Sequence, residues 1–336
     1  MKLLYPAVSN QVFGDSYGFP APVKGIRTKA FVTDMNEILS KFNVTILRFW
    51  LVPVEDVLLP KDNKGWVFRG GLGKELRKIG EKAYGQLFNT EPPYDVNYWE
   101  KASNIPRPYV IFPPLETKEL YTPQDFITFD LTLIGKAIDY LPYFVFSFYQ
   151  FARYGVGRKI GGKRGRCFLE RVETIKESNG EWGKPVYFGR NQRFCNEPHI
   201  ITGSDLLQRY DESQKELMLE FLTPTQIIHE GEPVLEQMNV VVLIKSLWRR
   251  IAPLAIYHCD VKCDLDPREL VENAVKEFNI TQSDLTWHKA TRYSKRQDER
   301  IYMDGFKGRL KLEGNLRRYI QFLLMGELVH IGKYTT

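Results

Sequence analysis

The sequence is poor in the residues that build disulfide frameworks and metal centres. Its 336 residues include only four cysteines, Cys167, Cys195, Cys259 and Cys263, and five histidines. Cysteines this few and this scattered exclude the disulfide-dense scaffold of a small secreted domain. We therefore expect free thiols in a reducing compartment and a cytoplasmic protein.

Long apolar runs are also missing. The opening stretch MKLLYPAVSN has no apolar core long enough for a signal peptide. The most apolar segment, residues 141–152, is shorter than the roughly 20 residues that a membrane-spanning helix needs, and Pro142 and Gln150 interrupt it. With 43% hydrophobic and 26% charged residues, the chain has a globular composition and enough length for two domains. We expect no membrane partner.

The glycine patterns of common nucleotide-binding enzymes are absent as well. RGGLGK (69–74) lacks the four-residue gap and the serine or threonine of a Walker loop, and no Rossmann pattern occurs. In WVFRGGLGKELRK (66–78) the glycines run into an expected helix start, where free N–H groups favour an anion. A tight turn whose glycines permit close helix packing is the alternative for these residues.

Strand and helix patterns alternate along the chain. Residues 43–54 and 125–134 are rich in β-branched and aromatic residues, which predicts strands. Residues 73–88 show helical spacing, and a second helix is expected over 136–153. After a polar stretch near 205–215 the pattern begins again, with an expected strand at 216–228 and expected helices at 234–252 and 268–278.

This repetition predicts an α+β protein with two tandem ferredoxin-like (RRM-like, split βαβ) domains. The N-terminal domain is expected over residues 1–210, with insertions, and the C-terminal domain over residues 211–336. The net charge of +6 is mild, so a polyanionic partner has to be argued from clusters of basic residues.

Two further segments concentrate basic residues. FARYGVGRKIGGKRGR (151–166) has six Lys or Arg, five Gly and no acid, which predicts a flexible cationic loop that can follow a sugar-phosphate backbone. A solvated surface loop is the alternative. Residues 292–321 carry nine Lys or Arg against four acids, interleaved with aromatic residues. Cations and aromatic rings together are suited to single-stranded RNA, although an ordinary amphipathic hairpin has the same pattern. The aromatic residues are Tyr293, Tyr302, Phe306 and Tyr319.

Three ordered motifs in the last fifty residues carry a resemblance: WHKATRYSKRQ (287–297), DGFKGRLKLEG (304–314) and GELVHIGKYTT (326–336). They resemble the C-terminal domain of CRISPR repeat-processing endoribonucleases of the RAMP superfamily. Earlier stretches are similar to the larger, glycine-rich branch of that group. These are FRGGLGKELR (68–77), PRPYVIFPPL (106–115), LIGKA (133–137) and FLTP (221–224).

The resemblance implies a positively charged cleft and metal-independent cutting of precursor CRISPR RNA within each repeat, with no cofactor. In such enzymes the 2′-hydroxyl attacks the neighbouring phosphorus, which requires a general base, an acid and cations. RNA is the implied partner, together with a CRISPR effector complex or a reverse transcriptase and integrase, to which some relatives are fused. The residues expected to bind RNA are Arg69, Lys74, Arg158, Lys159, Lys163, Arg164, Arg292, Arg296, Lys307, Arg309, Gly332 and Lys333.

The sequence also departs from this family. Familiar members place a catalytic histidine in the first domain, but no histidine precedes His199 here. His330, beside the glycine-lysine signature, and His288, beside Lys289, are the catalytic candidates. The family signature normally continues beyond this Gly-Lys pair, whereas the sequence ends at Thr336. A non-catalytic RNA-binding module and a DNA-binding subunit of an effector complex remain alternatives.

One cluster could suggest zinc. His258, Cys259 and Cys263 supply three potential ligands at close spacing, but local sequence offers no fourth, and a structural zinc usually takes four. We therefore expect ordinary thiols and no metal.

Overall fold

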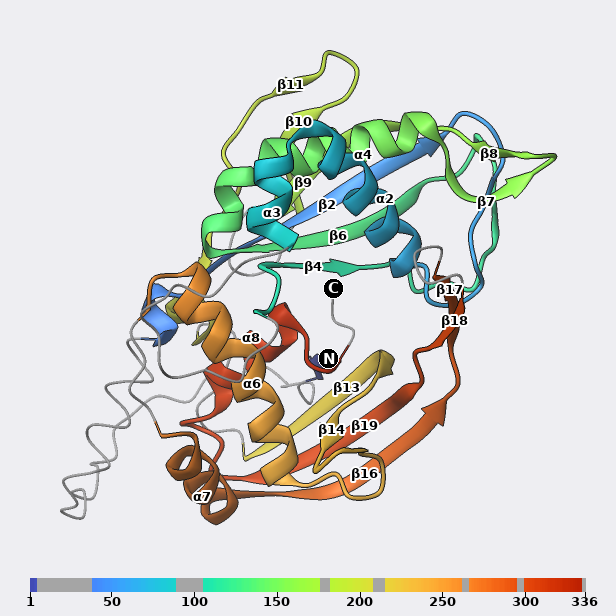
Figure 1. Ribbon diagram of the computed structural model, residues 1–336. Helices are drawn as coiled ribbons and strands as arrows, with labels where there is room; N and C mark the ends of the chain where they lie inside the picture. The colour runs from blue at the N-terminus through green and yellow to red at the C-terminus, as the bar shows by residue number, and fades with distance from the viewer. Residues whose placement is uncertain are drawn as a thin grey trace, which may run out of the picture.

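The structure of the chain is a computed structural model that describes residues 1–4, 38–88, 105–175, 182–207, 215–261, 266–294 and 299–333. The described residues form helices and antiparallel sheets, and each half of the chain has a sheet with helices packed on one face (Figure 1). The predicted α+β class is confirmed.

The first sheet has the strand order β11-β10-β9-β2-β6-β4, with β12 paired to β2. The strands are β2 (Asn43–Pro53), β4 (Tyr109–Phe112), β6 (Ile127–Ile134), β9 (Cys167–Ile175), β10 (Trp182–Phe188), β11 (Arg193–Phe194) and β12 (Ile201–Thr202). Helices α2 (Gly65–Ile79) and α3 (Glu81–Phe88) follow β2, and α4 (Leu141–Tyr154) follows β6. The order β9-β2-β6-β4 is that of a ferredoxin-like split βαβ unit, as predicted.

The alternation of apolar residues in β2 explains why the helices cover only one face of this sheet. Leu47, Phe49 and Leu51 are fully buried, whereas Arg48 and Trp50 between them are half-buried on the other face. The Phe49 ring lies 5.0 Å from that of Phe129 on β6 and 4.9 Å from that of Phe148 on α4. Aromatic packing therefore joins the sheet to α4.

The second sheet has the order β1-β13-β19-β16. Its strands are β1 (Lys2–Leu4), β13 (Glu216–Thr225), β16 (Phe278–His288) and β19 (Gly305–Gly314), and its helices are α6 (Val240–His258), α7 (Pro267–Glu277) and α8 (Ile320–Val329). β13, β16 and β19 are the first three strands of a second split βαβ unit, and β1 pairs with β13 at the edge that a fourth strand would take. The division near residue 210 stays a prediction, and β1 lies with the later strands.

Short elements complete the described chain. They are β3 (Val57–Leu58), β5 (Leu120–Tyr121), β7 (Val156–Ile160), β8 (Lys163–Gly165), β14 (Ile228–His229), β15 (Glu232–Pro233), β17 (Thr291–Ser294), β18 (Glu299–Tyr302), η2 (Gly135–Tyr140) and α5 (Gly203–Leu207). The prediction of a flexible loop over 151–166 is wrong. After the end of α4 the chain forms the β7–β8 hairpin, which projects from the body of the molecule (Figure 1). β3 links this hairpin to β5.

The glycines of RGGLGK do not open a helix. Helix α2 begins at Gly65, so Gly70 and Gly71 lie in its interior, where their N–H groups are not free to bind an anion. A Cβ at position 71 would lie 2.4 Å from the ring of Phe151 on α4. Close packing of α2 against α4, the alternative given above, explains Gly71.

Two predicted helix boundaries also shift. The helix expected from residue 234 begins at Val240, because Asn239 caps it by accepting a hydrogen bond from the N–H of Val242 (3.0 Å). The helix expected over 136–153 is divided into the 3-10 helix η2 and α4, which begins at Leu141 with Pro142 in its first turn. None of the helices in the described chain is both apolar enough and long enough to cross a membrane.

Candidate functional site

A pocket of about 230 Å³ lies where the two halves of the chain meet. Its first wall comes from the loop after β3 and the start of α2 (61–69) and from the segment after β4 (111–115). Its second wall comes from the end of β13 (222–226), the end of β16, and the segment after α8 (330–333). The volume far exceeds the space that one buried water needs, so the pocket can admit a ligand.

The pocket is strongly cationic. Among the described residues that line it, Asp62 is the only acidic one. The basic lining residues are Lys61, Lys64, Arg69, Lys289, Lys307 and Lys333, and His288 and His330 join them. A concave site of one charge sign attracts ligands of the opposite sign, so this pocket favours an anion such as phosphate.

His330 follows the last residue of α8 and has a positive φ of 54°. Its ring packs against Phe112 of the first half, with centroids 5.8 Å apart and an interplanar angle of 79°. Burial lowers the pKa of His330 well below its ordinary value, and the amino group of Met1 and the guanidinium of Arg250 lower it further. The imidazole is therefore neutral at pH 7 and keeps a ring-nitrogen lone pair, and the same burial makes it a weaker base than a free imidazole.

The segment after His330 is held in place by the backbone. Gly332 has a φ of 109°, which favours glycine, and the N–H of Lys333 donates to the carbonyl of Gln226 (2.8 Å). This bond ties the glycine-lysine motif to the loop after β13. Both residues line the pocket as a result.

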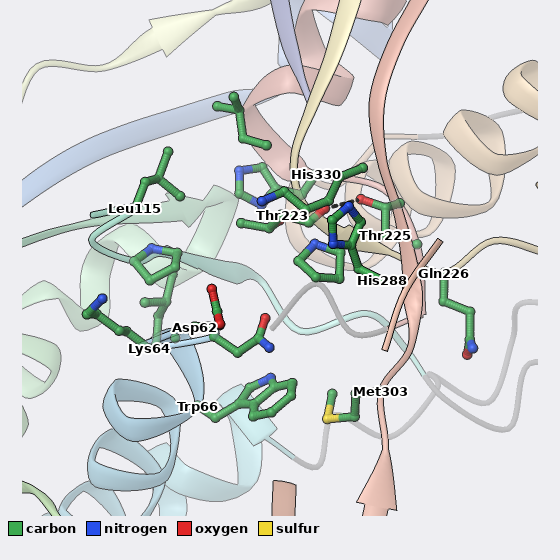
Figure 2. A pocket seen from close by; sticks show the side chains of 18 of the residues that line it. Asp62, Lys64, Trp66, Leu115, Thr223, Thr225, Gln226, His288, Met303 and His330 are labelled. Atoms are coloured by element: carbon green, nitrogen blue, oxygen red, sulfur yellow. Dashed lines mark hydrogen bonds between the residues drawn. The ribbon is translucent and has the colours of Figure 1, made fainter. Parts of the chain in front are cut away.

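His288 enters the pocket from a different element. It is the last residue of β16, is exposed, and lies opposite Gly305 in the β16–β19 register. Figure 2 shows His288 and His330 beside Thr223 and Thr225, with Asp62 and other residues of the first half on the facing side. The fold thus brings both predicted catalytic histidines to one pocket.

Lys64 lines the pocket, but its ammonium group already donates hydrogen bonds to backbone carbonyls of the protein. Its side chain is buried, and Nζ donates to the carbonyls of Lys61 (3.1 Å) and Glu116. Burial lowers the pKa of Lys64, chiefly by desolvation. Lys64 therefore joins the loop after β3 to the segment around Glu116. The carboxylate of Glu116 in turn accepts from Tyr121 Oη (2.6 Å), which also holds the first wall in place.

The residues predicted to bind RNA divide into those in the pocket and those outside it. Arg69, Lys307, Gly332 and Lys333 line the pocket. The outer group comprises Lys74 on α2 and Arg158, Lys159, Lys163 and Arg164 on the β7–β8 hairpin. Arg309 also lies outside and pairs with Glu220 (2.8 Å). Arg292 is on β17, whereas Arg296 lies outside the described residues.

Two of the four aromatic residues of the 292–321 segment have structural roles. Phe306 and Tyr319 are fully buried in the core, so the prediction that they are available to RNA bases is wrong. Tyr302 is 69% exposed. Trp66, which no sequence pattern had singled out, lines the pocket from the first turn of α2. Its signal was an aromatic residue beside a basic, glycine-bearing stretch.

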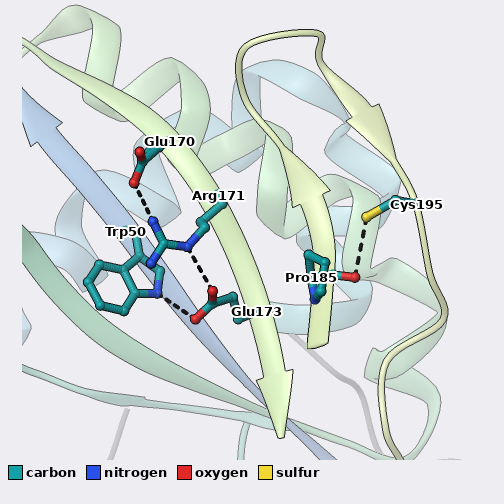
Figure 3. Close-up of polar contacts among 6 residues, drawn as sticks. All are labelled: Trp50, Glu170, Arg171, Glu173, Pro185 and Cys195. Carbon is teal, nitrogen blue, oxygen red and sulfur yellow. Dashed lines mark hydrogen bonds and ion pairs between the residues drawn. The ribbon is translucent and has the colours of Figure 1, made fainter. Parts of the chain in front are cut away.

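The zinc hypothesis gains no support from the described residues. The His258 ring Nε2 donates to the carbonyl of Pro106 (2.9 Å), and Cys263 lies outside the described residues. No group of three His, Cys, Asp or Glu side chains suited to a metal occurs in the described ranges. The thiols of Cys167, Cys195 and Cys259 are free, and Cys195 donates to the carbonyl of Pro185 (3.3 Å; Figure 3).

Comparison with solved structures shows similarity to Cas6 folds. The chain matches Thermus thermophilus Cas6 in a product complex with a TM-score of 0.51 and 14% identity, over 87% of this chain and 95% of that one. It matches a partial Cas6-RT-Cas1–Cas2 complex (TM-score 0.55, 14% identity) over 88% of this chain and 45% of that chain. It matches the Cas6-RT-Cas1–Cas2 complex with the same TM-score and identity over 28% of that chain. At this identity the likeness concerns the fold.

Two family models match the sequence. Residues 42–199 match an N-terminal domain model, AF_1859_N, and residues 219–336 match the model of the CRISPR-associated endoribonuclease Cas6. Comparison with curated proteins found no match. The Cas6 match contains both histidines of the pocket and the glycine-lysine motif. The C-terminal part of the chain, residues 219–336, is therefore similar to the CRISPR-associated Cas6 endoribonucleases.

Proposed function

We propose that this protein binds precursor CRISPR RNA and cuts it within the repeats, without a metal ion. The observation that carries this proposal is the meeting of His288 and His330 in one cationic pocket, although they follow different elements of the second half. Two histidines can supply the base and the acid of an RNA-cleaving step, and the surrounding cations can stabilise a crowded phosphorane.

The proposed reaction is an internal transfer at one phosphodiester. The 2′-oxygen attacks the adjacent phosphorus, the bond from phosphorus to the 5′-oxygen breaks, and the products carry a 2′,3′-cyclic phosphate and a 5′-hydroxyl. His330, which is neutral at pH 7 because burial lowers its pKa, accepts the proton of the 2′-hydroxyl. His288 in its protonated form donates a proton to the leaving 5′-oxygen. Lys307 and Lys333 hold the phosphate oxygens.

The decisive experiment uses repeat RNA from the same CRISPR locus in EDTA. We expect one cut per repeat and products with the ends given above. A repeat with a 2′-deoxy sugar at the cut position should bind and stay intact, because the attacking oxygen is missing. If the unmodified repeat is bound and remains whole, the nuclease proposal is wrong.

Histidine variants test the assignment of roles. His330→Ala and His288→Ala should each slow cleavage by about 10²-fold or more while RNA affinity is kept, since a positioned acid or base contributes on that scale. His229→Ala is the matched control, because His229 is on β14 and does not line the pocket. Cleavage at the parent rate in both pocket variants contradicts the proposal.

The second candidate function is an RNA-binding module without catalysis that guides a fused or associated reverse transcriptase and integrase in spacer acquisition. The absence of any histidine before His199 favours it, because the familiar catalyst of the first domain is missing. Similarity to a Cas6-RT-Cas1–Cas2 complex indicates the partner class. A protein that binds its repeat tightly and never cuts it, in the parent form as well as in the variants, has this function.

A further inference from the structure

Trp66 differs from the other tryptophans whose side chains the structure describes. The Trp50 indole N–H donates to Glu173 (2.9 Å), and the Arg171 guanidinium lies 4.1 Å from the centre of its ring (Figure 3). The ring of Phe126 also packs edge-on against Trp50. Trp248 is buried, and Trp287 packs against the core of the second half. These three indoles have structural roles.

The Trp66 indole has no such role. Its side chain is half-buried and makes no hydrogen bond, ion pair or ring contact within the described chain. Its neighbour Val67 packs against the core of the first half, which leaves Trp66 on the pocket side of α2. Figure 2 shows the indole facing Met303, which comes from the second half. Part of an aromatic side chain, with no ring or hydrogen-bond partner in the described ranges, thus lines the pocket.

The surroundings of this indole identify the chemistry that it suits. Arg69 and Lys307 line the same pocket, so a phosphate can lie near while an attached ring lies on Trp66. Stacking of an unpaired base on an aromatic side chain beside cations is the usual arrangement for single-stranded nucleic acid. A duplex cannot use this site, because its bases are stacked on each other.

We propose that Trp66 and Met303 form a slot for one unpaired nucleobase of the bound RNA, close to the histidines. This proposal rests on the proposed function, because it assumes that the pocket binds RNA. It adds that Trp66 holds a base and that this base is unpaired. The two halves of the chain contribute one side each, so the slot exists only where they meet. Because every base has a flat face, the slot selects single-stranded RNA rather than a particular base.

A double-mutant cycle tests the slot: protein variants are combined with altered RNAs, and binding affinity is measured for each pair. The RNAs are repeats with a 2′-deoxy sugar at the cut position, which prevents cleavage, and an abasic sugar at each position in turn. Trp66→Ala should weaken binding of the intact repeat by roughly 5-fold to 100-fold. At one position the abasic sugar should weaken parent binding to a similar extent and have little further effect on Trp66→Ala.

Two controls keep the test sharp. Phe188→Ala removes another exposed aromatic residue, on β10 and outside the pocket, and should show no coupling to any abasic position. Trp66→Phe keeps an aromatic face and should recover part of the lost affinity, which guards against a variant that fails to fold. Strictly additive effects at every RNA position overturn the slot even if the parent binds and cuts RNA. A parent that binds no repeat RNA contradicts the proposed function instead.

Discussion

At the scale of single residues, adjacent glycines in α2 should respond in opposite ways to the same change. Gly71→Ala places a Cβ 2.4 Å from the Phe151 ring, so we expect overpacking to destabilise the fold by about 1–3 kcal/mol. Gly70 is exposed and has nothing within 4 Å of a Cβ, so Gly70→Ala should stabilise it by about 0.5–1 kcal/mol. Denaturant unfolding measures both. Changes of equal sign would contradict this role for Gly71.

Sequence patterns identified residues of the pocket from their immediate neighbours, but they did not show which aromatic side chains are buried, because burial depends on tertiary packing. The glycine-lysine signature indicates His330, the neighbouring Lys289 indicates His288, and both histidines line the pocket. Phe306 and Tyr319 have the same pattern in sequence as exposed aromatic residues, but β19 and the start of α8 turn them into the core. Only the orientation of these elements, which depends on contacts distant in sequence, separates a core ring from a stacking surface.

At the scale of elements, the β7–β8 hairpin is a separate cationic surface. Lys159, Lys163 and Arg164 are exposed and form no ion pair in the described ranges. Replacing all three with glutamine should lower the slope of log affinity against log salt by about 0.7 for each lost contact to single-stranded RNA. Arg268 and Lys276 on α7 supply the matched control, because they are exposed and outside the pocket. If the salt dependence of affinity is unchanged in the hairpin variant, the β7–β8 hairpin does not contact RNA.

The hairpin also shows what a reading based on composition missed. Many glycines and no acid suggested a flexible loop, but the order of residues contains a turn signal. Gly161 and Gly162 form a two-residue connection between Ile160 and Lys163, and both have positive φ, as a type I′ turn requires. The paired strand β3 is distant in sequence, and for that reason the small sheet around the hairpin was not foreseen.

At the scale of the whole molecule, the two split βαβ units were predictable, whereas the pairing of β1 with β13 and the joint between the halves were not. The repeated strand-helix pattern predicted two split βαβ units, since each unit is built from neighbouring elements. The pocket, by contrast, depends on how one unit sits on the other. Arg69 and Lys333 were both predicted to bind RNA, but the pattern of neither segment indicates that they line one pocket.

His258 links the two halves and makes their joint sensitive to pH. Its Nε2 donates to the carbonyl of Pro106, which precedes β4, and burial lowers its pKa to about 4. The unfolded chain binds a proton near pH 6.5, before the folded chain does. The contribution of His258 to the free energy of unfolding is therefore fully present above pH 6.5. It falls as the pH drops toward 4, with a loss of about 2 kcal/mol by pH 5.

Substitution of His258 separates its titration from its hydrogen bond. His258→Gln keeps an N–H donor for Pro106 and cannot titrate, so its unfolding free energy should fall less between pH 7 and pH 5 than that of the parent. His258→Asn is shorter and loses the bond, so it should be destabilised at both values, with an equally shallow dependence on pH. Denaturant unfolding at the two pH values measures these differences. A parent whose stability declines no more than that of His258→Gln would show that another group governs the acid response.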